Sequence, residues 1–231
     1  MKIETCELEG LLIIEPKVFG DARGFFMEMW NQREYRQDGL AVDFVQDNLS
    51  LSCRGTLRGL HFQNPHPQGK LLGVLQGEVF DVAVDIRRGS PTFGRWHGLV
   101  LSAGNKRQFF VPAGFAHGFA VLSDTALFHY KCTDFYCPKD GLAVRWDDPD
   151  IGIRWPLKEP LLSPTDAKAL RLKDLPPARL FPYDPWNKRP SAQPRLGAPG
   201  TEALAASHRH PLYPGPSRGG LAGQAVLPAV S

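Results

Sequence analysis

Residues 79–87 have the sequence VFDVAVDIR, in which apolar side chains recur at every second position. One face of an extended chain would carry Phe80, Val82, Val84 and Ile86. The other would carry Val79, Asp81, Ala83, Asp85 and Arg87. A period of two residues is typical of a β-strand. The two aspartates indicate that the second face meets something polar, either a wet cavity in a closed β-roll or solvent beside an open sheet.

The segments around this strand are short, and turn residues separate them. We expect strands at 11–15, 24–30, 44–52, 70–75, 77–87, 96–101, 107–111, 118–122 and 126–133. This spacing predicts a sandwich or barrel. Helices are few: one short helix is expected over 31–37, and a second opens at Ser163 and continues to Leu170. Ser163, Pro164 and Asp166 suit a capping box. The fold is therefore predicted to be mostly β with a few short helices.

Composition separates a body from a tail. The chain has 231 residues, of which 42% are hydrophobic and 22% charged, a balance that excludes a disordered or fibrous protein. Residues 188–231 hold seven Pro, six Gly and eight Ala without a hydrophobic period. Such a segment buries too little apolar surface to offset its chain entropy. We expect one folded domain over 1–187 and a disordered tail over 188–231.

Charge and targeting signals exclude several partners. Five of the 27 Lys/Arg and one of the 24 Asp/Glu residues lie from Lys188 onward, so residues 1–187 carry a net charge of −1. Nucleic acid is therefore not an expected partner. No apolar run approaches the roughly 18 residues of a membrane span. The acidic start MKIETCELEG does not fit a signal peptide, so we expect a cytoplasmic protein without a membrane partner.

The cysteines and histidines do not form a familiar ligand set. Cys6, Cys53, Cys132 and Cys137 lack a C-x-x-C pair and are expected to be free thiols. Among the histidines of the body, the spacing of His61, His66, His117 and His129 matches no common metal site. No P-loop or Gly-rich dinucleotide fingerprint is present, so neither a metal nor an organic cofactor is expected.

Six stretches combine ionisable residues with apolar neighbours. They are FGDARGFFMEMW (19–30), QDNLSLSCRGTLRGLHFQ (46–63), QGKLLGVLQGEVFDVAVDIRRGSPTFGRW (68–96), VPAGFAHGFAVLSD (111–124), YKCTDFY (130–136) and WDDPDIGIRWP (146–156). In this order and spacing the chain resembles the dTDP-4-dehydrorhamnose 3,5-epimerase family over about residues 1–177. The resemblance implies a cupin-like jelly-roll β-barrel, without metal or cofactor, that is usually a homodimer.

The implied substrate is dTDP-4-dehydro-6-deoxy-D-glucose, whose C4 ketone acidifies the protons on C3 and C5. Inversion at both carbons gives dTDP-4-dehydro-L-rhamnose. This chemistry needs a base, an enolate stabiliser and an acid on the opposite face. The resemblance assigns these roles to His61 as base, Asp166 as its orienting acid and Tyr130 as proton donor. His61 and Tyr130 could instead be core residues, and Asp166 could serve only the capping box.

The remaining matched positions concern binding. Arg58 and Lys70 match cations that hold the enolate oxygen and the phosphates. Substrate contacts are implied for Arg23, Glu28, Gln46, Asn48 and His117, with Tyr136 stacking near the nucleotide base. In the family, the segment with Arg23 and Glu28 often comes from the partner subunit. Strict alternation would put Arg58 and His61 on opposite strand faces, but Gly59 permits a bulge that brings them together.

The chain departs from the family pattern at two positions. Gly141 stands where an acidic residue is usual, with Asp140 just before it, and Thr165 stands where Lys is frequent. Either Asp140 substitutes through a shifted loop or one nucleotide contact is missing. Three other functions remain open: an epimerase acting at C3 alone or C5 alone, a non-catalytic sugar-binding cupin, and a metal-dependent cupin. The missing ligand pattern disfavours the last of these.

Overall fold

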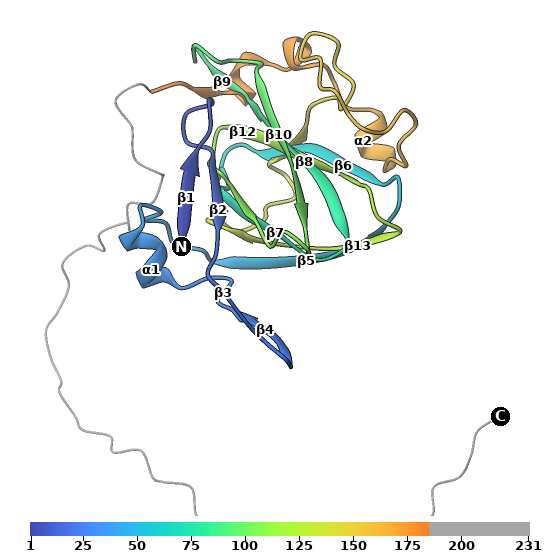
Figure 1. The fold of residues 1–231 in the computed structure, drawn as a ribbon. Coiled ribbons are helices and arrows are strands. Elements are labelled where there is room, and N and C mark those ends of the chain that lie inside the picture. The colour runs from blue at the N-terminus through green and yellow to red at the C-terminus, as the bar shows by residue number, and fades with distance from the viewer. Residues whose placement is uncertain (185–231) are drawn as a thin grey trace, which may run out of the picture. The chain divides into compact units, whose positions relative to one another are not determined.

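Two antiparallel β-sheets form the body of the protein in a computed structural model that describes residues 1–184 (Figure 1). The six-stranded sheet has the order β1-β2-β11-β7-β13-β5, whose strands span Lys2–Thr5, Leu12–Glu15, Gln108–Val111, Lys70–Gln76, Thr125–Cys132 and Gln46–Cys53. The five-stranded sheet has the order β10-β8-β12-β6-β14, with bounds Trp96–Ser102, Glu78–Asp85, Phe115–Val121, Leu57–Gln63 and Gly141–Ala143. Apart from β1 and β2, the neighbouring strands in both sheets are non-consecutive in sequence, as in a jelly-roll barrel.

The main core lies between the two sheets. Phe109, Phe128 and Leu72 enter it from the six-stranded sheet, while Val79 and Phe119 enter it from the five-stranded sheet. The predicted alternation of β8 is confirmed, because its other face packs against a second cluster that includes Ile151, Leu172 and Leu175. Since both faces of β8 are covered, even its aspartates are fully buried.

The two aspartates of β8 meet different polar partners. Asp81 faces the space between the sheets and accepts a hydrogen bond from His117 of β12. Asp85 ends the strand, and its carboxylate accepts hydrogen bonds from Arg87, Ser90 and Thr92 in the turn that follows. The polar surroundings that the sequence indicated are thus the interior of a closed roll for Asp81 and a tight turn for Asp85.

Both predicted helices are present, but the second is shorter than expected. Helix α1 spans Gln32–Gln37, and α2 spans Pro164–Ala167. Ser163 accepts a hydrogen bond from the Asp166 backbone N–H at 3.1 Å, as the capping box predicts. The helix does not reach Leu170, because Leu170 forms a β-bridge with Val144 just after β14. Two 3₁₀ helices follow, at Leu172–Asp174 and Pro177–Arg179.

The strand predictions hold for the long apolar segments and miss the short or irregular ones. The strands that were not predicted are β1, β3 (Val18–Asp21), β6, β9 (Arg87–Arg88), β14 and β15 (Phe181–Pro182). The predicted strand 24–30 ends earlier: β4 spans Gly24–Met27. The Met29 carbonyl beyond it instead accepts a hydrogen bond from the side chain of Gln108. Strands β3 and β4 pair with each other alone and form a hairpin that extends from the body (Figure 1).

The described residues belong to one compact unit. The predicted tail, 188–231, lies outside them, so the domain boundary stays a prediction. All four cysteines are free thiols, as expected. Within residues 1–184, no helix is long and apolar enough to cross a membrane.

A bulge in β6 brings Arg58 and His61 to the same side of the strand. The register with β12 pairs His117 with His61 and then Phe119 with Arg58, so β6 uses one more residue than its partner. Arg58 and His61 are exposed, while Gly59 and Leu60 between them are buried. The bulge expected at Gly59 is confirmed.

Gly59 permits this bulge because no other residue fits there. Its φ of +133° disfavours an L side chain, and a Cβ would lie 2.5 Å from the Cα of Gly118 on β12. Reciprocally, a Cβ on Gly118 would lie 2.7 Å from the backbone oxygen of Arg58. The two strands approach each other here more closely than side chains allow.

Replacing this glycine should destabilise the fold. We expect Gly59→Ala to lower the free energy of unfolding by about 1–3 kcal/mol or more, because backbone must move to relieve the overlap. Urea unfolding followed by tryptophan fluorescence measures this. Gly73→Ala on β7 is the matched control, since its Cβ would find only the Gln108 side chain at 3.8 Å. Equal stability of the two variants would contradict the close-approach argument.

Candidate active site

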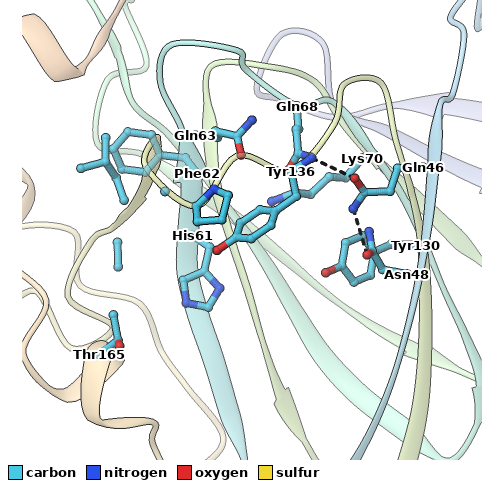
Figure 2. A pocket seen from close by; sticks show the side chains of 14 residues that line it. Gln46, Asn48, His61, Phe62, Gln63, Gln68, Lys70, Tyr130, Tyr136 and Thr165 are labelled. Atoms are coloured by element: carbon cyan, nitrogen blue, oxygen red, sulfur yellow. Dashed lines mark hydrogen bonds between the residues drawn. The ribbon is translucent and has the colours of Figure 1, made fainter.

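A cavity of about 520 Å³ lies where the two sheets and α2 meet (Figure 2). Strands β6 and β14 supply one part of its lining, and β5, β7 and β13 of the other sheet supply another. It is lined by Gln46, Asn48, His61, Phe62, Gln63, Gln68, Lys70, Tyr130, Tyr136, Pro138, Gly141, Leu142, Ala143 and Thr165. Residues from opposite sheets can therefore reach different sides of one bound molecule.

His61 and Asp166 form a close pair beside this cavity. The His61 Nε2 lies 2.6 Å from the Asp166 Oδ1, and the His61 side chain is 46% exposed whereas that of Asp166 is 3% exposed. Because an ionised carboxylate only accepts hydrogen bonds, Nε2 carries the proton of this contact and Nδ1 is the ring nitrogen left to take another. The pair therefore has the arrangement of a base with an orienting acid.

Burial and hydrogen bonding act in opposite directions on Asp166. Burial alone would raise the pKa of its carboxyl, but the hydrogen bond from His61, supported by Ser163 and the Gly59 backbone, keeps the pKa below its ordinary value. Its backbone N–H serves the helix cap while its carboxylate serves His61. The two interpretations of Asp166 are thus compatible, because different atoms carry them.

Lys70 and Tyr130 enter the cavity from the six-stranded sheet. Burial lowers the pKa of the Lys70 ammonium, and the nearby Cys132 and Asp81 oppose that shift. Burial raises the pKa of the Tyr130 phenol, with Cys132 adding to the effect and Arg58 opposing it. The Tyr130 phenol therefore keeps its proton at neutral pH, as a proton donor must.

His117 and Asp81 form a second pair, buried between the sheets. The His117 Nε2 lies 2.9 and 3.0 Å from the two carboxylate oxygens of Asp81. Burial lowers the pKa of the His117 imidazole even though the Asp81 carboxylate opposes the shift. His117 is not part of the cavity lining, but it pairs in register with His61 on the neighbouring strand.

Three of the predicted binding residues are linked by hydrogen bonds (Figure 2). The Gln46 amide donates to Asn48 Oδ1 at 3.0 Å, and Gln46 Oε1 accepts from the Tyr136 backbone N–H at 2.8 Å. Tyr136 is 61% exposed at the cavity rim. Arg58 lies outside the lining, and its Nε donates to Ser52 Oγ at 3.0 Å.

Arg23 and Glu28 are also absent from the lining of the cavity, as Arg58, His117 and Asp166 are. Arg23, on the β3–β4 hairpin, has a side chain that is 90% exposed and paired with Asp21 at 2.5 Å. Glu28 accepts a hydrogen bond from Asn31. The two residues that depart from the family pattern, Gly141 and Thr165, both line the cavity. The Asp140 carboxylate instead lies 2.6 Å from His66 Nδ1, which favours a missing contact over a substitution.

Several lining residues were not singled out in the sequence. They are Phe62, Gln63, Gln68, Pro138, Leu142 and Ala143. Gln63 and Gln68 lie within the quoted stretches, and amides at strand ends were a usable signal. The sequence of β14 gave no such signal, because a strand of three residues is too short to show a periodic pattern. Within residues 1–184, no group of three or more His, Cys, Asp or Glu side chains is arranged to hold a metal ion.

Residues 5–174 match the family model described as dTDP-4-dehydrorhamnose 3,5-epimerase. The chain belongs to this family. A dTDP-4-dehydrorhamnose 3,5-epimerase of Methanothermobacter thermautotrophicus is 57% identical over 65% of this chain and 82% of its own length. The crystal structure of the Legionella pneumophila dTDP-6-deoxy-D-glucose-3,5-epimerase with dTDP-4-keto-L-rhamnose is 52% identical and covers 79% of this chain and 98% of its own, with a TM-score of 0.78.

A family relative with a narrower activity is less similar. ChmJ, a 3'-monoepimerase from Streptomyces bikiniensis solved with dTDP-quinovose, is 37% identical. It covers 73% of this chain and 86% of its own, with a TM-score of 0.69. The family fold is thus common to double and single epimerases.

Asp166→Asn should make stability less sensitive to acid. The folded-state pKa of Asp166 is lowered, so its contribution to the free energy of unfolding is present above the unfolded pKa of about 3.9 and is lost as pH falls through the folded pKa. Urea unfolding at steps from about pH 6 to about pH 3 should therefore show a shallower decline in the variant. Asp124→Asn, at a side chain that is 94% exposed, is the control. A decline as steep as that of the wild type would contradict the pairing.

Proposed function

We propose that this protein inverts C3 and C5 of dTDP-4-dehydro-6-deoxy-D-glucose to give dTDP-4-dehydro-L-rhamnose. One observation carries the proposal: the His61–Asp166 pair comes from β6 and α2, whereas Tyr130 and Lys70 come from the opposite sheet, and all but Asp166 line one cavity. Inversion requires removal of a proton from one face of a carbon and its return to the other. A base and an acid on opposing walls meet that requirement.

The reaction begins when His61 Nδ1 takes the proton from C3 or C5. The electron pair of the broken C–H bond moves into the ketone and gives an enolate, whose oxygen Lys70 stabilises with Arg58 nearby. Asp166 stabilises the imidazolium that has formed. The Tyr130 hydroxyl then delivers a proton to the opposite face, and the raised pKa of the phenol keeps that proton available at neutral pH.

The competing functions make different demands on the site. A non-catalytic sugar-binding cupin needs neither a base with an orienting acid nor a phenol across from it. An epimerase acting on one carbon uses the same groups, so only similarity separates it: relatives named as 3,5-epimerases reach 57% identity, against 37% for the 3'-monoepimerase. This difference favours inversion at both carbons.

We infer that the protein acts as a homodimer in the cytoplasm. The β3–β4 hairpin exposes Val18, Phe19, Phe25 and Phe26 at 43, 62, 61 and 66%. A soluble chain rarely leaves such a cluster uncovered. Leu49 and Leu51, exposed at 59 and 64% on the edge strand β5, add a second apolar surface. A partner subunit covering the hairpin would receive Arg23 near its cavity. The free thiols suit a reducing compartment.

His61→Ala should abolish both proton exchange and epimerisation. With purified protein and the dTDP-4-keto sugar in D₂O, proton NMR should show deuterium entering C3 and C5 with the wild type and at neither carbon with the variant, because no other group starts the reaction. Exchange at one carbon alone in the wild type would support the single-site epimerase. Wild-type exchange by His61→Ala would remove His61 from the role of base.

Tyr130→Phe should separate exchange from inversion. The variant keeps the ring and loses only the hydroxyl, so His61 still removes a proton and returns deuterium to the same face. We expect exchange to continue while the rate of inversion falls by about 10²–10⁴-fold, the usual contribution of a positioned acid. Product analysis by NMR beside the exchange measurement checks this. Full inversion by Tyr130→Phe would assign the acid to another group.

Complementation between inactive variants tests whether the hairpin acts across subunits. Arg23→Ala and His61→Ala should each be nearly inactive alone. In a mixed dimer, one of the two sites has both an intact His61 and an Arg23 from the other chain, so the isolated mixed dimer should recover about half of the wild-type activity. Co-expression with two affinity tags isolates the mixed dimer. No recovery would mean that Arg23 does not act on the partner's cavity.

A further inference from the structure

Tyr136 lies in a stretch of chain that has no regular secondary structure. Residues 135–137 follow the end of β13 and precede the turn that leads to β14. No strand ladder holds Tyr136, and 61% of its side chain is exposed. Side-chain hydrogen bonds to its backbone hold this segment at the rim of the cavity instead.

The side-chain amide of Gln63 bonds to the residues on both sides of Tyr136. Gln63 Oε1 accepts a hydrogen bond from the Cys137 backbone N–H at 2.8 Å, and Nε2 donates to the Phe135 carbonyl at 3.0 Å. The same Nε2 also donates to the His66 carbonyl at 2.6 Å. Gln63 is only 4% exposed, so these bonds form away from water. Figure 2 shows its amide beside the Tyr136 segment.

Gln63 is placed to hold this segment because it ends β6 two residues after His61. The bulged strand that presents His61 therefore also fixes the loop with Tyr136. Other bonds assist: Gln46 accepts from the Tyr136 N–H, and Gln68 donates to the Asp134 carbonyl. Only the Gln63 amide contacts both neighbours of Tyr136 among the hydrogen bonds of the described residues.

We propose that Gln63 is a positioning residue for nucleotide recognition, acting through Tyr136. The inference rests on the proposed function, in which Tyr136 stacks on the base of the dTDP group. A ring that is held before the ligand arrives loses little conformational freedom on binding, so a fixed loop increases affinity. Gln63 itself does not take part in proton transfer.

The test uses thymidine diphosphate and inorganic pyrophosphate as probes, with binding measured by calorimetry on the full chain. Gln63→Met keeps the length of the side chain and removes all three hydrogen bonds. We expect it to weaken thymidine diphosphate binding by about 10–100-fold and to leave pyrophosphate binding unchanged, because pyrophosphate has no base to stack. Gln63→Glu retains the acceptor for the Cys137 N–H but turns a carboxylate oxygen toward the Phe135 and His66 carbonyls, so it should lose at least as much affinity as Gln63→Met. Gln76→Met, at the exposed end of β7, is the matched control.

Two further measurements separate positioning from a general structural effect. In steady-state kinetics, Gln63→Met should raise KM by the same factor while kcat changes by less than about threefold. In the Tyr136→Ala background, Gln63→Met should cost little additional thymidine diphosphate affinity, because the two residues act as one unit. Full additivity of the two variants, or wild-type affinity of Gln63→Met, would overturn the proposal.

Hydrogen exchange makes the result independent of turnover. The Cys137 amide should exchange faster in Gln63→Met than in Gln76→Met, whatever the protein's substrate is. If the wild type fails to epimerise the dTDP-sugar while Cys137 exchange and nucleotide affinity still respond to Gln63, the proposed function fails and the positioning role stands. If exchange at the Cys137 amide is unchanged in Gln63→Met while the wild type epimerises the dTDP-sugar, the positioning role fails and the proposed function stands.

Discussion

The close approach of β6 and β12 at Gly59 and Gly118 is the constraint on which the site depends. A Cβ on either residue would overlap the backbone of the other strand, so two glycines are needed where the strands meet. The bulge that results places Arg58 and His61 on one side of β6 and aligns His61 with His117. In a regular strand, Arg58 and His61 would lie on opposite faces. The side of β6 on which His61 lies is therefore set by backbone packing.

The barrel also controls the charge of the groups around the cavity. Lys70, Asp81 and His117 lie within one another's electrostatic reach, and burial acts on the pKa of each. Because the Asp81 carboxylate bonds to His117, the buried imidazole is held in one tautomer. Asp166 does the same for His61 at the cavity edge. Two His–Asp pairs thus share neighbouring strands, one fully enclosed and one open to a ligand.

Irregular chain completes the site, and side-chain amides hold it in place. Gln46, Gln63 and Gln68 bond to the backbone of the segment that carries Tyr136. The Asp140 carboxylate contacts His66 Nδ1. The next residue, Gly141, lines the cavity and contributes no side chain to it. The wall near Tyr136 is therefore more open in this chain than an acidic residue at position 141 would make it.

The sequence by itself determined the strands whose apolar period is long enough to read, such as β8, and the helix start at Ser163, because these features depend on local spacing and capping. Its ordered motifs also indicated His61, Tyr130 and Lys70. The resemblance also paired Asp166 with His61, but only the tertiary structure decided that this carboxylate, 105 residues away, meets the ring as well as serving the helix cap, and that Asp140 contacts His66. It also decided the end of α2, through the pairing of Leu170 with Val144. The reason is physical: a local pattern fixes which face a residue occupies, whereas contacts between distant segments depend on how the two sheets close around a shared core.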